Sequence, residues 1–152
     1  MVETKRQKSK WRMMLSAMGL ATVLMASAAH AETSVSVVSG GVNPNPVECG
    51  QSFGVTFTAS LNGKPGTGAE CTANNVTWSW TTTVSGPDGS HSYVGNGAST
   101  TVVYMPGSPG TYSISATATA SYESSAECGG NGSKSGSGSD SVEAIEIECP
   151  EG

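Results

Sequence analysis

The sequence predicts an all-β fold, a β-sandwich or a barrel, for the chain that follows residue 31. Apolar and polar residues alternate with period two in several stretches, and the side chains of a strand point alternately to its two faces. These stretches are rich in Thr, Val, Tyr and Phe, which favours strands over helices. Turns that contain Gly and Pro separate the stretches at short intervals, which is typical of sandwiches and barrels.

The first 31 residues have the three-part pattern of a secretory signal peptide. A basic segment, residues 1–12, precedes an uncharged apolar stretch, residues 13–28. Ala29 and Ala31 supply the small residues that a signal peptidase reads, so cleavage is expected after Ala31. The apolar stretch is too short for a comfortable membrane span; an uncleaved N-terminal anchor is the alternative. We therefore expect a secreted protein, extracellular or periplasmic, that does not insert into a membrane after cleavage.

A single domain is expected over residues 32–152, which are enough for a modest core. The whole chain has 7 Lys and Arg and 12 Asp and Glu. Five of the basic residues and one acidic residue lie in residues 1–31, so residues 32–152 carry a net charge of −9. Nucleic-acid binding relies on Lys and Arg that neutralise phosphates, so this charge argues against a nucleic-acid partner.

Six or seven strands are expected in this domain, with turn residues between them. Alternation is clearest where Phe53, Val55 and Phe57 share one face, and where Tyr112 and Ile114 do so later in the chain. The expected strands are 35–39, 52–61, 76–85, 90–94, 100–105, 111–122 and 141–149. Before the last of them, residues 129–139 are rich in Gly and Ser and without an apolar pattern. This composition predicts a flexible loop; a linker to a detached tail is the alternative.

The two tryptophans of the third expected strand raise a choice between core and ligand surface. Trp78 and Trp80 are two residues apart, so they point to the same face of a strand. The opposite face carries Thr and Ser, which favours burial of both indoles in the core, and of Trp78 more than of Trp80, which lies nearer the middle or exit of the strand. The alternative is a carbohydrate platform of exposed rings. If the tryptophans are buried, the next candidates for a ligand surface are Tyr93, Tyr104 and Tyr122. The expected core residues are Phe53, Val55, Phe57, Trp78, Trp80, Tyr112 and Ile114.

No catalytic, metal or cofactor site is predicted. His91 is the single histidine after residue 31, and it has no nucleophile motif beside it, so a histidine in a surface loop is expected. No DxDxDG calcium loop or GxxxxGK[ST] phosphate loop occurs. Asn75-Val76-Thr77 and Asn131-Gly132-Ser133 fit the glycosylation acceptor pattern, which matters only in a host with that machinery.

The cysteines predict two disulfides. Cys49, Cys71, Cys128 and Cys149 all lie in the exported part of the chain, where oxidation is available. They form no CxxC pair, so neither a zinc site nor a thioredoxin-type motif is expected. Four cysteines allow three pairings, and sequence alone does not choose among them.

Several motifs together resemble the PKD-type (polycystic-kidney-disease-type) and related bacterial Ig-like modules. VTWSWTTTVSGPDG is similar to the Trp-containing third strand and turn of that family, and GSPGTYSISATATA to its Gly-x-Tyr start of a long strand. GQSFGVTFTAS resembles its second strand. The chain departs from the family where Trp80-Thr81-Thr82-Thr83 replaces an aromatic-Gly-Asp-Gly motif.

The resemblance implies an Ig-like (PKD-type) β-sandwich of about seven antiparallel strands with two disulfides. In that topology Cys71 and Cys128 lie in loops at one end, and Cys49 and Cys149 lie at the other. The implied pairs are therefore Cys71–Cys128 and Cys49–Cys149.

Three functions remain open. The leading one is a non-catalytic secreted or cell-surface module for structure, adhesion or protein–protein interaction, whose partner is a protein or a cell-surface polysaccharide. The second is a small carbohydrate-binding protein that uses exposed aromatics. The third is a secreted enzyme or enzyme inhibitor, for which the catalytic constellations are missing.

Overall fold

The structure, a computed structural model, describes residues 32–146. The signal peptide expected over residues 1–31 and the expected disulfide partner Cys149 lie outside this range. The described part is all β apart from one short 3-10 helix, η1. Its elements are β1 (Ser34–Asn43), β2 (Val47–Glu48), β3 (Phe53–Asn62), β4 (Asn74–Gly86), β5 (Gly89–Asn96), β6 (Ser99–Tyr104), β7 (Gly110–Glu123), η1 (Ala126–Cys128) and β8 (Gly132–Ile145).

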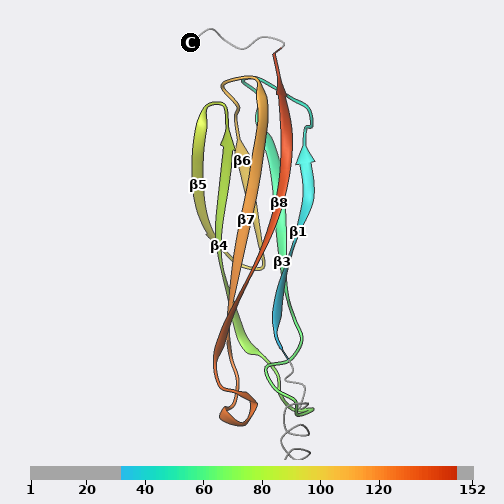
Figure 1. Ribbon diagram of the computed structural model, residues 1–152, viewed down its shortest axis with the longest axis vertical. Coiled ribbons are helices and arrows are strands. Elements are labelled where there is room, and N and C mark those ends of the chain that lie inside the picture. The colour runs from blue at the N-terminus through green and yellow to red at the C-terminus, as the bar shows by residue number, and fades with distance from the viewer. Residues whose placement is uncertain (1–31, 147–152) are drawn as a thin grey trace, which may run out of the picture. The chain divides into compact units, whose positions relative to one another are not determined.

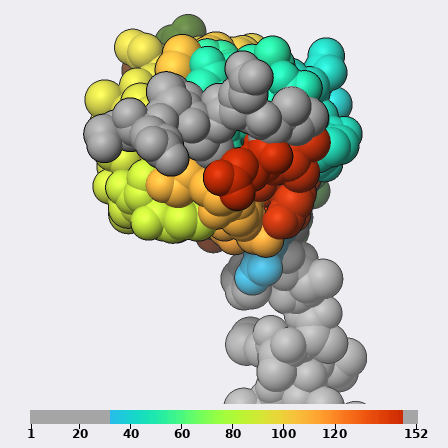
Figure 2. Space-filling model, turned by 90° about the horizontal axis from the view of Figure 1, so that it is seen from above, coloured from blue at the N-terminus to red at the C-terminus, as the bar shows by residue number. Residues whose placement is uncertain are grey.

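Two sheets face each other across one core, which confirms the predicted Ig-like sandwich. One sheet has three strands in the order β1-β3-β6, and the other has five in the order β2-β8-β7-β4-β5. Figure 1 shows β5 as the outermost strand on one side of the domain. In Figure 2, which looks along the strands, the cyan and teal residues of β1 and β3 lie across from the red residues of β8. The short β2 was not predicted, and it pairs with β8 in parallel, whereas the other strand pairs are antiparallel.

The core follows the predicted alternation in β3 and β7. Every second side chain of these strands is buried, while the intervening Ser and Thr face outward. Ala116, Ala118 and Ala120 keep the inner face of β7 thin, so the larger side chains of the opposite sheet can reach it. The buried large side chains include Phe53, Val55, Phe57, Trp80, Val84, Tyr112 and Ile114.

The two tryptophans differ in depth. Trp80 is 2% exposed, and its indole N–H donates to the carbonyl oxygen of Gly97 at 2.7 Å. Trp78 is half-buried and packs against the edge of the core. Gly97 lies two residues before the start of β6, so Trp80 is level with that start, and Trp78, two residues earlier in β4, lies beyond it. The indole under the complete double layer is therefore Trp80.

The Gly/Ser-rich segment is a strand, contrary to the loop expected over residues 129–139. From Gly132 onward the chain forms β8, which pairs with β7 without a register shift from Gly132 to Ala144. Its inner face is made of glycine where β1 lies across it: a Cβ on Gly136 would lie 2.2 Å from the backbone oxygen of Val35. The composition that indicated a flexible coil thus permits a close approach of two strands.

A disulfide joins the two loops at one end of the sandwich. Cys71, between β3 and β4, bonds to Cys128 in η1, with a Cα–Cα distance of 5.4 Å. Gly66 packs against it, because a Cβ there would lie 2.8 Å from the Cys71 sulfur. Cys49 is buried at the end of β2. Its pairing with Cys149 stays a prediction.

Candidate functional site

Hydroxyl groups cover the outer side of the five-stranded sheet. Strands β8, β7, β4 and β5 each present Ser or Thr at successive outward positions, and the pairing aligns these positions in rows across the sheet. We call this surface the hydroxyl face. It consists of Thr77, Ser79, Thr81, Thr83 and Ser85 of β4, Ser90 and Ser92 of β5, Ser113, Ser115, Thr117, Thr119 and Ser121 of β7, and Ser133, Ser135, Ser137, Ser139 and Ser141 of β8.

Neighbouring hydroxyls of the face bond to one another across the strands. Thr119 and Ser135 are joined at 2.8 Å between their side-chain oxygens, and Thr83 and Ser92 at 3.2 Å. Such cross-strand pairs each stabilise a sheet by roughly 0.2–1 kcal/mol. A hydroxyl both donates and accepts, so the face can still bond to a partner from above.

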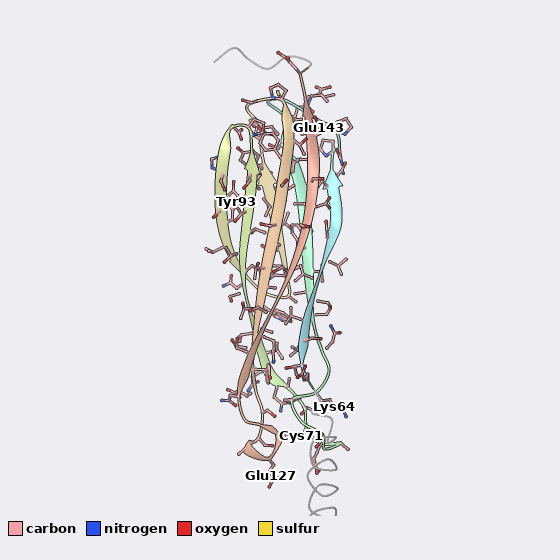
Figure 3. All side chains as sticks on the ribbon, viewed as in Figure 1. Lys64, Cys71, Tyr93, Glu127 and Glu143 are labelled. Atoms are coloured by element: carbon pink, nitrogen blue, oxygen red, sulfur yellow. A yellow bond between two sulfur atoms is a disulfide. The ribbon has the colours of Figure 1, made fainter. Side chains whose placement is uncertain are left out.

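Carboxylates border the hydroxyl face at both ends and do not enter it. At one end Glu143 accepts a hydrogen bond from Thr111 at 2.7 Å, and at the other Glu123 accepts one from Asn75, also at 2.7 Å. Figure 3 shows Glu143 at the end of the domain away from Cys71. Although residues 32–152 carry a net charge of −9, this face is uncharged, as are the strands β1, β3 and β6 of the other sheet.

An open cleft of about 470 Å³ lies where the hydroxyl face meets the disulfide-bonded end. Asn75 sits there at a register shift of β4 and has a left-handed backbone, with φ of 49°. Such a conformation is uncommon outside glycine, although asparagine tolerates it better than most residues. The cleft is lined by Asn75, Thr77, Ser121, Tyr122, Glu123, Asn131 and Gly132. Both asparagines of the two glycosylation acceptor patterns therefore line one polar cleft.

The tyrosines expected as ligand candidates are mostly committed to the interior. Tyr122 is buried, and its hydroxyl lies 3.0 Å from the Thr33 hydroxyl. Tyr104 is half-buried, with its ring 5.9 Å from the Phe53 ring. Among the aromatic residues in 32–146, Tyr93 on β5 is the exposed one, at 38%. No row of exposed rings forms in this part of the chain.

A polar cluster fixes the β4–β5 turn to the loop that precedes β7. Burial acts to raise the pKa of Asp88, but the N–H of Gly107, which donates at 3.0 Å, and the Tyr104 hydroxyl outweigh it and lower that pKa. Burial, and then the bond to Asp88, raise the pKa of Tyr104. His91 lies in strand β5 and not in the expected loop, with its ring 5.3 Å from the Tyr104 ring.

Comparison with known families identifies the fold. The family model for the PKD domain matches residues 31–128. The chain belongs to the PKD domain family. PKD domains are extracellular Ig-like modules, often used in adhesion or interaction, and they are generally non-catalytic.

The match ends at Cys128, so the PKD match does not include β8 and its part of the hydroxyl face. Comparison with curated proteins and with solved structures found no match.

The described part of this PKD domain shows no candidate metal centre or membrane helix. Within residues 32–146, no three side chains of His, Cys, Asp or Glu come together in a way that could hold a metal ion. The same residues include no helix long and apolar enough to cross a membrane.

Sequence reasoning identified the Ser and Thr side of each strand as a solvent face, but it did not identify the rows. The rows depend on register, because Thr117 meets Thr81 on one side and Ser137 on the other only when three distant strands align. Alternation of Gly136 and Gly138 with Ser135, Ser137 and Ser139 was the one available signal that β8 belongs to this face.

Proposed function

We propose that this PKD domain is a non-catalytic secreted or cell-surface module that acts by binding a partner in adhesion or in the structure of the cell envelope. The observation that carries the proposal is the hydroxyl face: apart from Val94 of β5, four strands fill the outward positions of this face with uncharged hydrogen-bonding side chains in register. An extended sheet surface of this kind suits a broad partner better than a small substrate. Enzyme sites instead bring titratable groups together in a concave pocket.

The low cost of desolvating the hydroxyl face is a second reason to expect a partner to bind there. A partner that covers charged side chains must strip their water, which is costly unless each charge is paired. Hydroxyl groups cost less to cover, and those of Thr117 and Ser137 already lie 3.1 Å apart, so part of their bonding capacity is met before a partner arrives. Export by the signal peptide predicted over residues 1–31 would bring this face to the cell exterior.

Binding to the cells or extracellular matrix of the source organism tests this proposal. Fluorescently labelled, oxidised protein is expected to bind in a saturable manner and to be displaced by unlabelled protein. Protein in which the native disulfide has been reduced and alkylated serves as a control. Binding that does not saturate, or that is equal for the control, would contradict the proposal.

A carbohydrate-binding function is the second candidate, and the cleft beside the hydroxyl face favours it. Its lining combines Asn75, Asn131 and Glu123, whose amide and carboxylate groups can bond to sugar hydroxyls. The version that relies on stacked aromatic rings has less support, since Tyr93 lies on the outermost strand, as Figure 3 shows, away from the cleft.

Affinity measurements on a broad polysaccharide panel test this second candidate. Glu123→Gln is expected to weaken binding at least tenfold, because a charge-assisted hydrogen bond to the sugar is lost. Glu143→Gln is the matched control, since it changes an equivalent carboxylate at the other end of the face. No binding to any polysaccharide, or equal losses in the two variants, would rule out the cleft as a sugar site.

A further inference from the structure

Strand β5 ends the five-stranded sheet with an open edge. Among the strands described over residues 32–146 it pairs with β4 alone, from Ser79↔Asn96 to Gly86↔Gly89. Gly86 and Gly89 flank a two-residue turn and so form a hydrogen-bonded pair, after which bonded and non-bonded pairs alternate along the hairpin. The backbone N–H and C=O groups of Ser90, Ser92, Val94 and Asn96 therefore point away from β4, toward the open edge.

This edge lacks the usual protection against strand addition. Proteins commonly guard an edge with charged residues, proline, a bulge or a very short strand. β5 has eight residues, none of them charged or proline, and its register with β4 is unbroken. At the other end of the same sheet, β2 has two residues. Val94, at the middle of the open edge, is 88% exposed, the largest exposure among the large apolar residues described.

Charge favours the β5 side of the domain over the β8 side for contact between like molecules, because β8 carries Lys134, Asp140 and Glu143, whereas β1, β3 and β4 are as free of charge as β5. No Asp, Glu, Lys or Arg occurs between Asp88 and Glu123, so β5 and β6 carry none. Two copies with net charges of −9 repel each other least when they approach through such a surface.

We propose that β5 pairs antiparallel with β5 of a second copy and joins the two five-stranded sheets into one continuous sheet. This inference rests on the proposed function, because it names one partner of the interaction module. In the symmetric register Tyr93 opposes Tyr93 of the copy, and Ser92 opposes Val94. The residues with outward backbone groups then meet one another, which supplies about eight backbone hydrogen bonds.

Side-chain sizes suit this register. Tyr93 meets its copy in a non-hydrogen-bonded pair, where side chains come closest and aromatic pairs stabilise a sheet. His91 opposes Gly95 of the copy, which has no side chain and leaves room for the imidazole ring. The pairing would also cover Tyr93, which is 38% exposed in one copy. Since one strand edge buries little area, the dimer is expected to be weak and to form at high local concentration.

Sedimentation velocity on the purified, oxidised protein, at concentrations from about 10 μM to about 1 mM, tests whether the protein dimerises through β5. The protein is expected to pass from monomer to dimer in this range. Val94→Pro removes one outward N–H that β4 does not use, so it should preserve the fold and weaken dimerisation at least tenfold; Val94→Lys should act in the same direction. Val94→Thr keeps the N–H and should dimerise within a few-fold of the parent protein.

Two further variants test the register and the choice of edge. Tyr93→Cys should form a disulfide-linked dimer on non-reducing gels, whereas Val94→Cys should not, because it faces Ser92 of the copy. Val103→Lys changes a residue of β6 that is 61% exposed, and it should leave dimerisation unchanged.

Three outcomes would overturn the β5 pairing: a monomer at every concentration, equal dimerisation by Val94→Pro and the parent protein, or a loss with Val103→Lys as large as with Val94→Pro. Binding to cells separates this failure from that of the proposed function. A monomer that still binds cells in a saturable manner refutes the β5 pairing alone, and a monomer that does not bind refutes both.

Discussion

At the scale of single residues, two glycines and the hydrogen-bonded side chain of Trp80 decide how closely the elements approach. Gly136 admits the backbone of β1 over β8, and Gly86 lies under the ring of Tyr112, where a Cβ would be 2.2 Å from the nearest ring carbon. Trp80 closes the core from the other side with its bond to Gly97. Sequence reasoning placed both tryptophans inward and favoured burial of Trp78 over Trp80, but the structure shows the reverse order, because the level at which β6 starts is a tertiary feature.

Gly136→Ala tests the close approach of β1 and β8. The added Cβ would lie 2.2 Å from a backbone oxygen, so one of the two strands must shift. We expect a loss of about 1–3 kcal/mol in the free energy of unfolding, as for other overpacked sites. Gly54→Ala is the matched control in a strand, since its Cβ would lie 3.9 Å from the nearest atom. Chemical denaturation that gives equal stabilities for the two variants would contradict this packing.

Acid titration tests the role of Asp88. Its pKa is lower in the folded state than in the unfolded state. Its ionisation therefore stabilises the fold above the unfolded pKa of about 3.9, and this contribution is lost as the pH falls through the folded pKa. Asp88→Asn should lower the free energy of unfolding at pH 7 and lower it less at pH 3. A difference between parent and variant that does not change with pH would contradict the cluster.

At the scale of elements, the strands with large inward side chains were predicted from the sequence, and the strand with small ones was not. The strands 52–61 and 111–122 were predicted almost to their observed bounds, because large apolar residues alternate with Ser and Thr in them. β8 was missed over residues 132–139, because its inward residues there include Gly136 and Gly138, which carry no apolar signal. The segment forms a strand because it packs closely against β1, and composition does not encode this tertiary contact.

Amide hydrogen exchange resolves the state of β8 in solution. The amides of residues 133–144 that bond to β7 should be protected nearly as well as those of β7 itself, since the two strands pair along their whole shared length. Residues 129–131, which precede β8, should exchange early. Complete exchange of residues 133–139 within the shortest labelling time would show that this segment is a loop, as its composition suggests.

At the scale of the whole molecule, the distribution of charge organises the surface. The carboxylates Glu143 and Glu123 mark the two ends of the hydroxyl face, and the charge-free β5 edge borders it along one side. The sequence predicted an acidic exported module without a catalytic site. It did not predict the hydroxyl face, which depends on the register of four strands. The PKD family fits a module that acts by binding, and the hydroxyl face is where we expect a partner to bind.

The most direct test of this account is a comparison of two single substitutions in binding to the source organism's cells or matrix. Thr117→Glu places a charge in the middle of the hydroxyl face, and Thr58→Glu places the same charge at an outward position of β3 in the other sheet. We expect Thr117→Glu to weaken binding at least tenfold and Thr58→Glu to leave it within about twofold, with unfolding temperatures alike, because an unpaired buried charge costs several kcal/mol. Equal binding by the two variants, or a greater loss with Thr58→Glu, would show that the partner does not use the hydroxyl face.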